Sequence, residues 1–268
     1  LFGKSARPTE APPTDFAFVL LSEARLPCAE EVAQAFCSFA SPGETIAAAG
    51  DETNAAEKRE VLSLQLSTGE TAFVALIPMP VPKGEADDAV RFSLSSFRDG
   101  WTLPPHTAHL LVTALGGVHA SPAVRLSRFT SLLAAVTQAS PAVGVYWGNA
   151  GATHDAAFFL DVASGRGVVP RLMLWSGMSI ACEDDGRRSL LSLGMEQLAL
   201  PDLLLVVGER SKNAAIEILF DLLAYVVERG AALPEGDTIG RTGEEQLPVR
   251  YVPSPINPNK RVWRVEFP

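Results

Sequence analysis

The sequence predicts an α+β protein built from two related sandwich-like halves. Hydrophobic residues make up 47% of the chain and charged residues 20%, which is typical of a globular protein with a sizeable core. Residues 203–207 are continuously apolar and precede a helical pattern over 211–229 that leaves only Glu217, Asp221 and Glu228 on its polar side. Such a pair of elements belongs in the middle of a domain.

The first half follows the order β-α-β-β-β-α-β. Residues 1–14, which contain three prolines, are expected to form an extended arm. Period-2 or continuous apolar patterns predict the strands, and apolar spacing of three and four predicts the helices. The expected elements are a strand at 15–21, a helix from Pro27 to Pro42, strands at 45–49, 61–66 and 71–77, a helix over 84–97 and a strand at 106–115, with a charged loop at 51–60.

Ser121-Pro122 starts a connecting helix at 119–140, because serine followed by proline is a favoured helix beginning. The second half, 141–268, repeats the order of the first half, 15–118, at a spacing of about 127 residues, which suggests an internal duplication. We expect mixed or antiparallel sheets with helices on one side. Its expected elements are a strand at 143–147, a helix at 153–163, strands at 171–182, 189–193 and 203–207, a helix at 211–229, and strands at 237–242, 249–253 and 262–267.

Composition limits the kinds of partner. A net charge of −9 and a pI near 5.0 argue against nucleic-acid binding, which requires concentrated Lys and Arg. A basic partner fits this acidic chain better than an acidic partner does. No window is apolar enough for a membrane span, and the beginning of the sequence lacks a signal-peptide pattern. Cys28, Cys37 and Cys182 show no C-x-x-C spacing, so we expect free thiols and a cytoplasmic protein.

Three segments of the second half carry a family resemblance. They are Ser192-Leu193-Gly194-Met195-Glu196-Gln197-Leu198 with Leu200-Pro201-Asp202, then Glu235 to Gly240 with Pro248-Val249-Arg250, and finally Val262 to Glu266. Together they resemble the bacterial domain-of-unknown-function 4261 family over roughly 147–267. This family carries no established reaction. Its members are often encoded among toxin, immunity and secretion genes, so the resemblance implies a role in such systems by association alone.

No set of residues predicts catalysis or metal binding. His106 and His109 are three apart on a predicted strand and would face opposite sides, so with His119 they do not form a metal site. Ser176 or Cys182 with His154 lacks the G-x-S-x-G pattern of a nucleophile. The turn at 148–153 could hold an anion, but a plain turn with Thr153 as the helix cap is simpler. We expect no catalytic residues, metal or cofactor.

The candidate binding residues lie in the second half. Gly194 and Glu196 form a bend with an acidic group before an apolar strand, and a partly buried Glu196 would need a cation such as Arg188 or Arg210. The remaining candidates are Trp175 and the acidic turn Glu183, Asp184 and Asp185.

The sequence therefore favours a non-enzymatic cytoplasmic interaction protein, of the immunity or adaptor kind, that holds a basic partner such as a toxin or secretion component. The alternative is a small-molecule-binding protein or hydrolase with a pocket between the two halves. A polar pocket that contains Glu196, His154 or Ser176 would favour this alternative.

Overall fold

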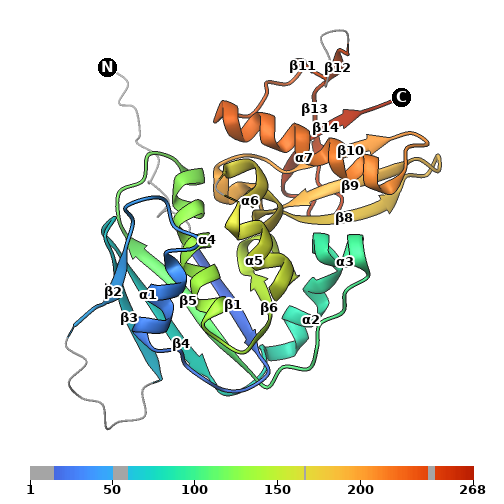
Figure 1. Ribbon diagram of the computed structural model, residues 1–268. Helices are drawn as coiled ribbons and strands as arrows, with labels where there is room; N and C mark the ends of the chain where they lie inside the picture. The colour runs from blue at the N-terminus through green and yellow to red at the C-terminus, as the bar shows by residue number, and fades with distance from the viewer. Residues whose placement is uncertain (1–14, 51–59, 166, 241–244) are drawn as a thin grey trace, which may run out of the picture.

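The computed structural model describes residues 15–50, 60–165, 167–240 and 245–268 (Figure 1). The predicted arm at 1–14 and most of the charged loop at 51–60 lie outside these residues. The fold is α+β, as predicted. A seven-stranded antiparallel sheet has the order β2-β3-β4-β5-β1-β6-β7. Its strands are β1 (Asp15–Leu21), β2 (Ile46–Ala48), β3 (Val61–Leu66), β4 (Glu70–Ile77), β5 (Ala108–Gly116), β6 (Ala142–Trp147) and β7 (Ala152–Asp155).

Helices cover the inner face of this first sheet, on the near side in Figure 1. They are α1 (Ala29–Phe36), α4 (Pro122–Gln138) and α5 (Ala156–Ser164), and α6 (Val168–Trp175) packs in turn on α4 and α5. On the outer face, the segment of η1 (Pro82–Gly84), α2 (Glu85–Asp88) and η2 (Ala89–Phe92) packs over Leu20 and Tyr146 and contacts Phe18. The short helix α3 (Leu94–Asp99) follows. Helical segments therefore lie on both faces of this sheet, which corrects the expectation of helices on one side.

The second sheet is mixed and has the order β13-β14-β10-β9-β8. Strands β10 and β14 run parallel, whereas the other pairs are antiparallel. Helix α7 (Lys212–Arg229) packs against it, with Ser211 as N-cap and Gly230 at φ +68° as C-cap. The strands are β8 (Gly177–Cys182), β9 (Arg188–Leu193), β10 (Leu203–Val207), β13 (Arg250–Pro253) and β14 (Arg261–Glu266), while β11 (Thr238–Ile239) and β12 (Leu247–Pro248) form a separate ribbon.

Two predicted elements are wrong. The helix expected at 153–163 starts only at Ala156, because Gly151 at φ +58° reverses the chain and β7 pairs back on β6. Asp155, not Thr153, caps α5 by accepting from the Phe158 N–H. The strand expected at 171–182 is helix α6 followed by β8. The short apolar run 172–175 fits a buried helix as well as a buried strand, and here the helix forms.

The first sheet extends across residue 141, where the sequence analysis began the second half. Strand β6 pairs with β1, and β7 completes the sheet edge. The strand order β2-β3-β4-β5 of the first sheet resembles β8-β9-β10-β14 of the second, and the internal duplication stays a prediction. The last pair of strands in each order differs in direction: β4 and β5 are antiparallel, whereas β10 and β14 are parallel.

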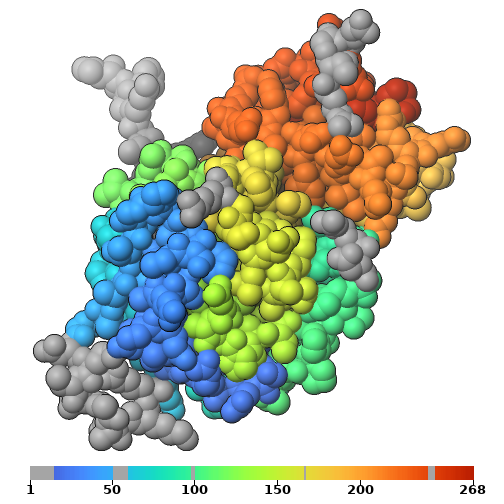
Figure 2. All heavy atoms as spheres, in the orientation of Figure 1, coloured from blue at the N-terminus to red at the C-terminus, as the bar shows by residue number. Residues whose placement is uncertain are grey.

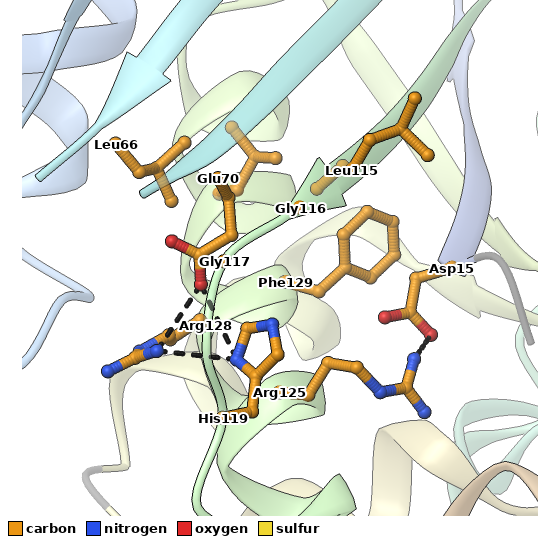
Figure 3. Close-up of a pocket in the computed structure, with 12 residues that line it drawn as sticks. Asp15, Leu66, Glu70, Leu115, Gly116, Gly117, His119, Arg125, Arg128 and Phe129 are labelled. Carbon is orange, nitrogen blue, oxygen red and sulfur yellow. Dashed lines mark hydrogen bonds and ion pairs between the residues drawn. The ribbon is translucent and has the colours of Figure 1, made fainter. Parts of the chain in front are cut away.

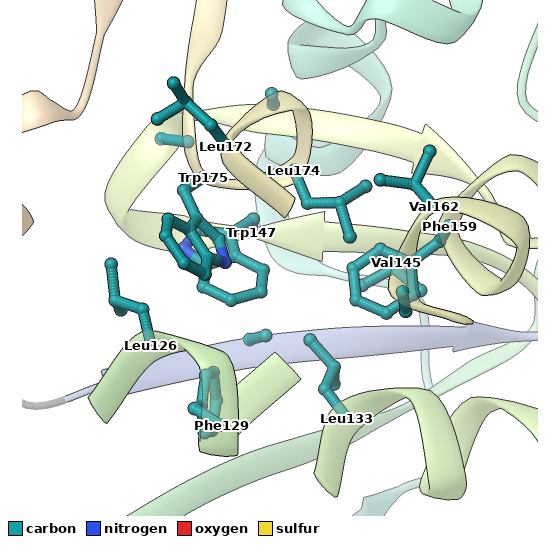
Figure 4. Packing of buried hydrophobic residues seen from close by; sticks show 14 of the residues in the cluster. Leu126, Phe129, Leu133, Val145, Trp147, Phe159, Val162, Leu172, Leu174 and Trp175 are labelled. Atoms are coloured by element: carbon teal, nitrogen blue, oxygen red, sulfur yellow. The ribbon is translucent and has the colours of Figure 1, made fainter. Parts of the chain in front are cut away.

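One buried cluster runs through both sheets. Trp147 of β6 lies between Phe129 of α4 and Phe159 of α5, with ring centroids 5.4 and 6.3 Å away. Trp175 lies close by in the same cluster (Figure 4). The two layers accordingly form one continuous body on the face shown in Figure 2. No helix in the described part of the chain is long and apolar enough to cross a membrane.

Candidate functional site

The predicted bend at Gly194 and Glu196 lies where the two sheets meet. It is the 3-10 turn η4 (Met195–Leu198), between β9 and β10. Gly194 has φ +92°, and a Cβ atom there would lie 2.6 Å from the Asn149 carbonyl oxygen and 2.8 Å from the Ala150 Cα. Glycine is therefore required for η4 to approach η3 (Gly148–Ala150), the turn that follows β6.

Gln197 fixes this junction. Its Oε1 accepts from the Trp147 indole N–H at 3.0 Å, and its Nε2 donates to the Trp175 carbonyl at 2.6 Å. Arg125 of α4 donates to the Gln197 carbonyl at 2.8 Å. Gln197 is itself buried. These bonds connect η4 to the first sheet and two of its helices, so the geometry at the junction is rigid.

Asp202 holds η4 from the other side. Its Oδ1 accepts from the Met195 N–H at 3.0 Å and from the Ser192 hydroxyl at 3.2 Å. Ser192 Oγ in turn accepts from the Leu203 N–H at 2.8 Å. Burial raises the pKa of Asp202 to about 6, against the lowering effect of these two donors; the nearby Glu196 charge raises this pKa, and the Lys260 charge lowers it.

A groove of about 470 Å³ opens at this junction. We call it the junction groove. Asn149 lines it, and the Asn149 Nδ2 is buried without a hydrogen-bond partner among the described residues. The other lining residues include Gly148, Gly151, Gly194, Glu196, Asp202, Ser254, Lys260 and Arg261. It contains Glu196, but all of its lining residues lie within 148–262, so it is inside the predicted second half and not between the two predicted halves.

Glu196 is more exposed than expected. Its side chain is 66% exposed and forms an ion pair with Lys260, whose Nζ lies 2.7 and 2.9 Å from the two carboxylate oxygens. The predicted cation partners were wrong, since Arg188 and Arg210 donate to the carbonyls of Arg210 and Pro268. An exposed pair of this kind contributes little stability, about 0–1 kcal/mol.

The other candidate binding residues lie elsewhere. Trp175 is fully buried and donates its indole N–H to Thr130 Oγ1 at 2.8 Å, so it belongs to the core and cannot contact a partner. In the acidic turn, Glu183 faces Arg264 at 3.4 Å and Asp185 faces Arg187 at 2.7 Å. Asp184 is exposed. The turn is largely neutralised by the chain's own arginines.

A second polar cavity, of about 290 Å³, lies between α4 and the first sheet (Figure 3). Arg125 forms an ion pair with Asp15, and Arg128 faces Glu70 at 3.3 Å. His119 Nδ1 lies 3.5 Å from the same Glu70 oxygen. Burial raises the pKa of Asp15, although the Arg125 guanidinium opposes this shift. Both buried carboxylates in the cavity are thus compensated by an arginine.

Sequence reasoning missed this cavity. Its charges come from segments more than 50 residues apart, such as Glu70 and Arg128. The only local signals are the three-residue spacing of Arg125 and Arg128, which places both on one helix face, and the Gly116-Gly117 pair. A Cβ atom on Gly117 would lie 2.6 Å from Glu70 Cγ, so this glycine makes room for the carboxylate.

The predicted catalytic candidates do not converge. His154 is fully buried, its Nδ1 lies 2.9 Å from Ser93 Oγ, and its Nε2 lies 3.2 Å from the Leu174 carbonyl. Ser176 is also buried, and its hydroxyl donates to the Gly177 carbonyl. Cys182 is exposed. The described residues contain no group of three or more His, Cys, Asp or Glu that could hold a metal ion.

Comparison with known proteins adds one finding. Residues 191–266 match the family described as "Domain of unknown function (DUF4261)", so the predicted resemblance is confirmed over this segment. The matched segment contains Glu196, Asp202 and Lys260, and most of the residues that line the junction groove lie within it. No curated protein and no solved structure matches the chain.

Proposed function

We propose that this chain is a non-enzymatic binding protein that holds a basic partner at the junction groove. A lysine or arginine side chain of the partner enters the groove and meets the Asp202 carboxylate, with Glu196 at the rim. An immunity or adaptor role in the cytoplasm, with a toxin or secretion component as partner, is the setting that the family association suggests.

One observation carries this proposal, namely the contrast between Asp202 and the two buried carboxylates of the first sheet. Asp15 and Glu70 each face an arginine of α4. Asp202 receives hydrogen bonds only from the neutral donors Met195 and Ser192 among the described residues. A partly buried negative charge without a bonded cation is costly, and a cationic group from outside would remove that cost.

The hydrogen-bonding geometry leaves room for such a group. Both donors to Asp202 reach Oδ1, so Oδ2 is left for a ligand. Lys260 is held by Glu196 through an exposed ion pair, and exchanging its ammonium for that of a partner costs little. The net charge of −9 further favours association with a basic protein, because long-range attraction speeds encounter.

Calorimetric titration with lysine-rich, arginine-rich and glutamate-rich peptides of equal length tests the proposal. We expect the two basic peptides to bind and the acidic one not to bind. Asp202→Asn keeps an oxygen acceptor for Met195 and Ser192 but removes the charge, and it should weaken binding by at least tenfold, since losing one partner of a desolvated charge pair costs about 2–5 kcal/mol.

Glu228→Gln is the matched control, because Glu228 is an exposed carboxylate on α7 outside the junction groove. It changes the net charge by the same amount and should leave the affinity within about twofold. Equal weakening by both substitutions would reduce the effect to overall charge and contradict a role for the groove.

The groove also supports the alternative of a small-molecule-binding protein, because Glu196 lines it and it lies between the two sheets. Free arginine amide and lysine amide separate the two functions. Binding of the free amides as tightly as the peptides would favour a small ligand. Hydrolase activity has less support, because His154 and Ser176 are both buried and bonded to other groups.

A further inference from the structure

We infer that two copies of the chain associate through the outer face of the first sheet. This face consists of the side chains of β1 to β5 that point away from α1 and α4. Because side chains alternate along a strand, Ala17 and Val19 of β1 point into the core, and the residues between them point outward. Apart from the area around Leu20, which η1–α2–η2 covers, the outer face comprises Phe16, Phe18, Ala47, Val61, Ser63, Gln65, Thr71, Phe73, Ala75, Leu111, Thr113 and Leu115.

Strand register arranges these side chains in continuous rows. One row runs Phe18, Leu111, Ala75, Val61, and the next runs Phe16, Thr113, Phe73, Ser63. The third row runs Leu115, Thr71, Gln65, Ala47. The apolar residues thus lie side by side across neighbouring strands and form a contiguous patch, unlike single surface hydrophobics, which need no explanation.

The described helices leave this patch open. The η1–α2–η2 segment packs over Leu20, near the end of β1, and over Tyr146 of β6, which stacks on Phe18; among the residues of the three rows it reaches only Phe18. Phe16, Phe73 and Leu111 are partly exposed and belong to none of the buried clusters. Val61 and Leu115 are 49% and 50% exposed. An antiparallel sheet that faces water normally carries polar and charged side chains there.

The absence of charge points to a second copy as the occupant. None of the outer-face residues is Asp, Glu, Lys or Arg, although the chain has 53 such residues, 22 basic and 31 acidic. Two copies each carrying −9 repel one another at long range, and an uncharged contact face adds the least short-range repulsion to this. A basic partner would find no carboxylate on this face. A twofold arrangement brings the same uncharged rows together from both copies.

The size of the face suits a dimer of moderate affinity. Each of the three rows crosses four strands. With strands about 4.8 Å apart and same-face residues about 6.8 Å apart, the twelve residues cover roughly 400 Å² of flat area, and the accessible surface of their side chains exceeds it. A stable interface buries about 800 Å² per partner, so we expect dimerisation in the micromolar range.

Sedimentation equilibrium of the full chain between 1 and 100 µM tests the inference. We expect a monomer–dimer equilibrium. Ser63→Arg places a charge in the middle row without removing an apolar side chain, and twofold symmetry brings two such charges into one interface. It should weaken dimerisation at least tenfold. Ser38→Arg, at an exposed position after α1, is the control and should leave dimerisation unchanged.

Circular dichroism shows whether Ser63→Arg still folds, and Gln65→Lys, at an exposed position of the third row, serves as a second variant if it does not. A full chain that stays monomeric at 100 µM would overturn the inference. So would a dimer that both outer-face substitutions leave intact, since its interface would then lie elsewhere. Slower amide exchange in β3 to β5 at the higher concentration would support the assigned face.

Discussion

Acidification should destabilise the chain through His154. This imidazole is fully buried, and burial lowers its pKa to about 4 from the ordinary value of 6.5. The folded state therefore favours the neutral ring. As pH falls below 6.5, the unfolded chain takes up a proton that the folded chain refuses until pH approaches 4, so the free energy of unfolding decreases across this window.

The magnitude follows from the two pKa values. The full difference of about 2.5 units corresponds to about 3 kcal/mol, because one unit is worth about 1.4 kcal/mol. Between pH 7 and pH 5 the loss amounts to about 2 kcal/mol. This is a large part of the stability of an ordinary domain, about 5–15 kcal/mol.

Asp202 acts in the opposite direction over the same range. Its pKa is raised to about 6 from 3.8, so the folded state binds a proton more readily than the unfolded chain. Stability attributable to Asp202 therefore increases by about 1 kcal/mol as pH falls from 7 to 5. The wild-type profile alone will show only the difference between the two effects.

Substitutions separate the pH effect of His154 from that of Asp202. Urea unfolding at pH 7 and pH 5 gives the free energy of unfolding for wild type, His154→Gln and Asp202→Asn. The advantage of wild type over His154→Gln should shrink by about 2 kcal/mol on going to pH 5, whereas its difference from Asp202→Asn should move about 1 kcal/mol in favour of wild type. A His154 difference that is independent of pH would refute this explanation.

Three further substitutions should change stability in a definite order, measured by the same unfolding assay. Arg128→Ala should cost about 3–5 kcal/mol, because it leaves the buried Glu70 carboxylate without its arginine. Gly194→Ala should cost at least about 1–3 kcal/mol, since its positive φ is strained for alanine and the new Cβ meets the Asn149 carbonyl. Lys260→Ala should cost less than about 1 kcal/mol, because its ion pair with Glu196 is exposed. A larger loss for Lys260→Ala than for Arg128→Ala would contradict the contrast between the two ion pairs.

The sequence predicted those parts of the fold that depend on local pattern. The apolar run at 203–207 and the helix after Ser211 form as expected, because burial, N-cap and terminal glycine all agree there. The prediction for 168–175 was wrong because the apolar run 172–175 has only four residues, which is too short for a period to distinguish helix from strand. The prediction of Trp175 as a binding residue was wrong for the same reason, since the residue ends helix α6 and points into the core.

The candidate site was predicted in part. Gly194 and Glu196 do lie at a groove, and the short Gly-Met-Glu-Gln bend was the signal. Asp202 stood within the family-like segment, but its chemistry depends on η3, which comes from residues about 50 positions earlier and closes over η4. No local pattern conveys such burial. The Arg128–Glu70 pair was missed for the same reason.

The pH dependence of binding is the most direct test of Asp202 as the group that receives a cation. Titration of an arginine-rich peptide into wild type between pH 5 and pH 7.5 should show affinity rising through about pH 6 as the carboxyl loses its proton. Asp202→Asn should bind weakly and without this rise. Equal affinity at pH 5 and pH 7.5, or an unchanged rise in Asp202→Asn, would contradict the proposed role of the junction groove.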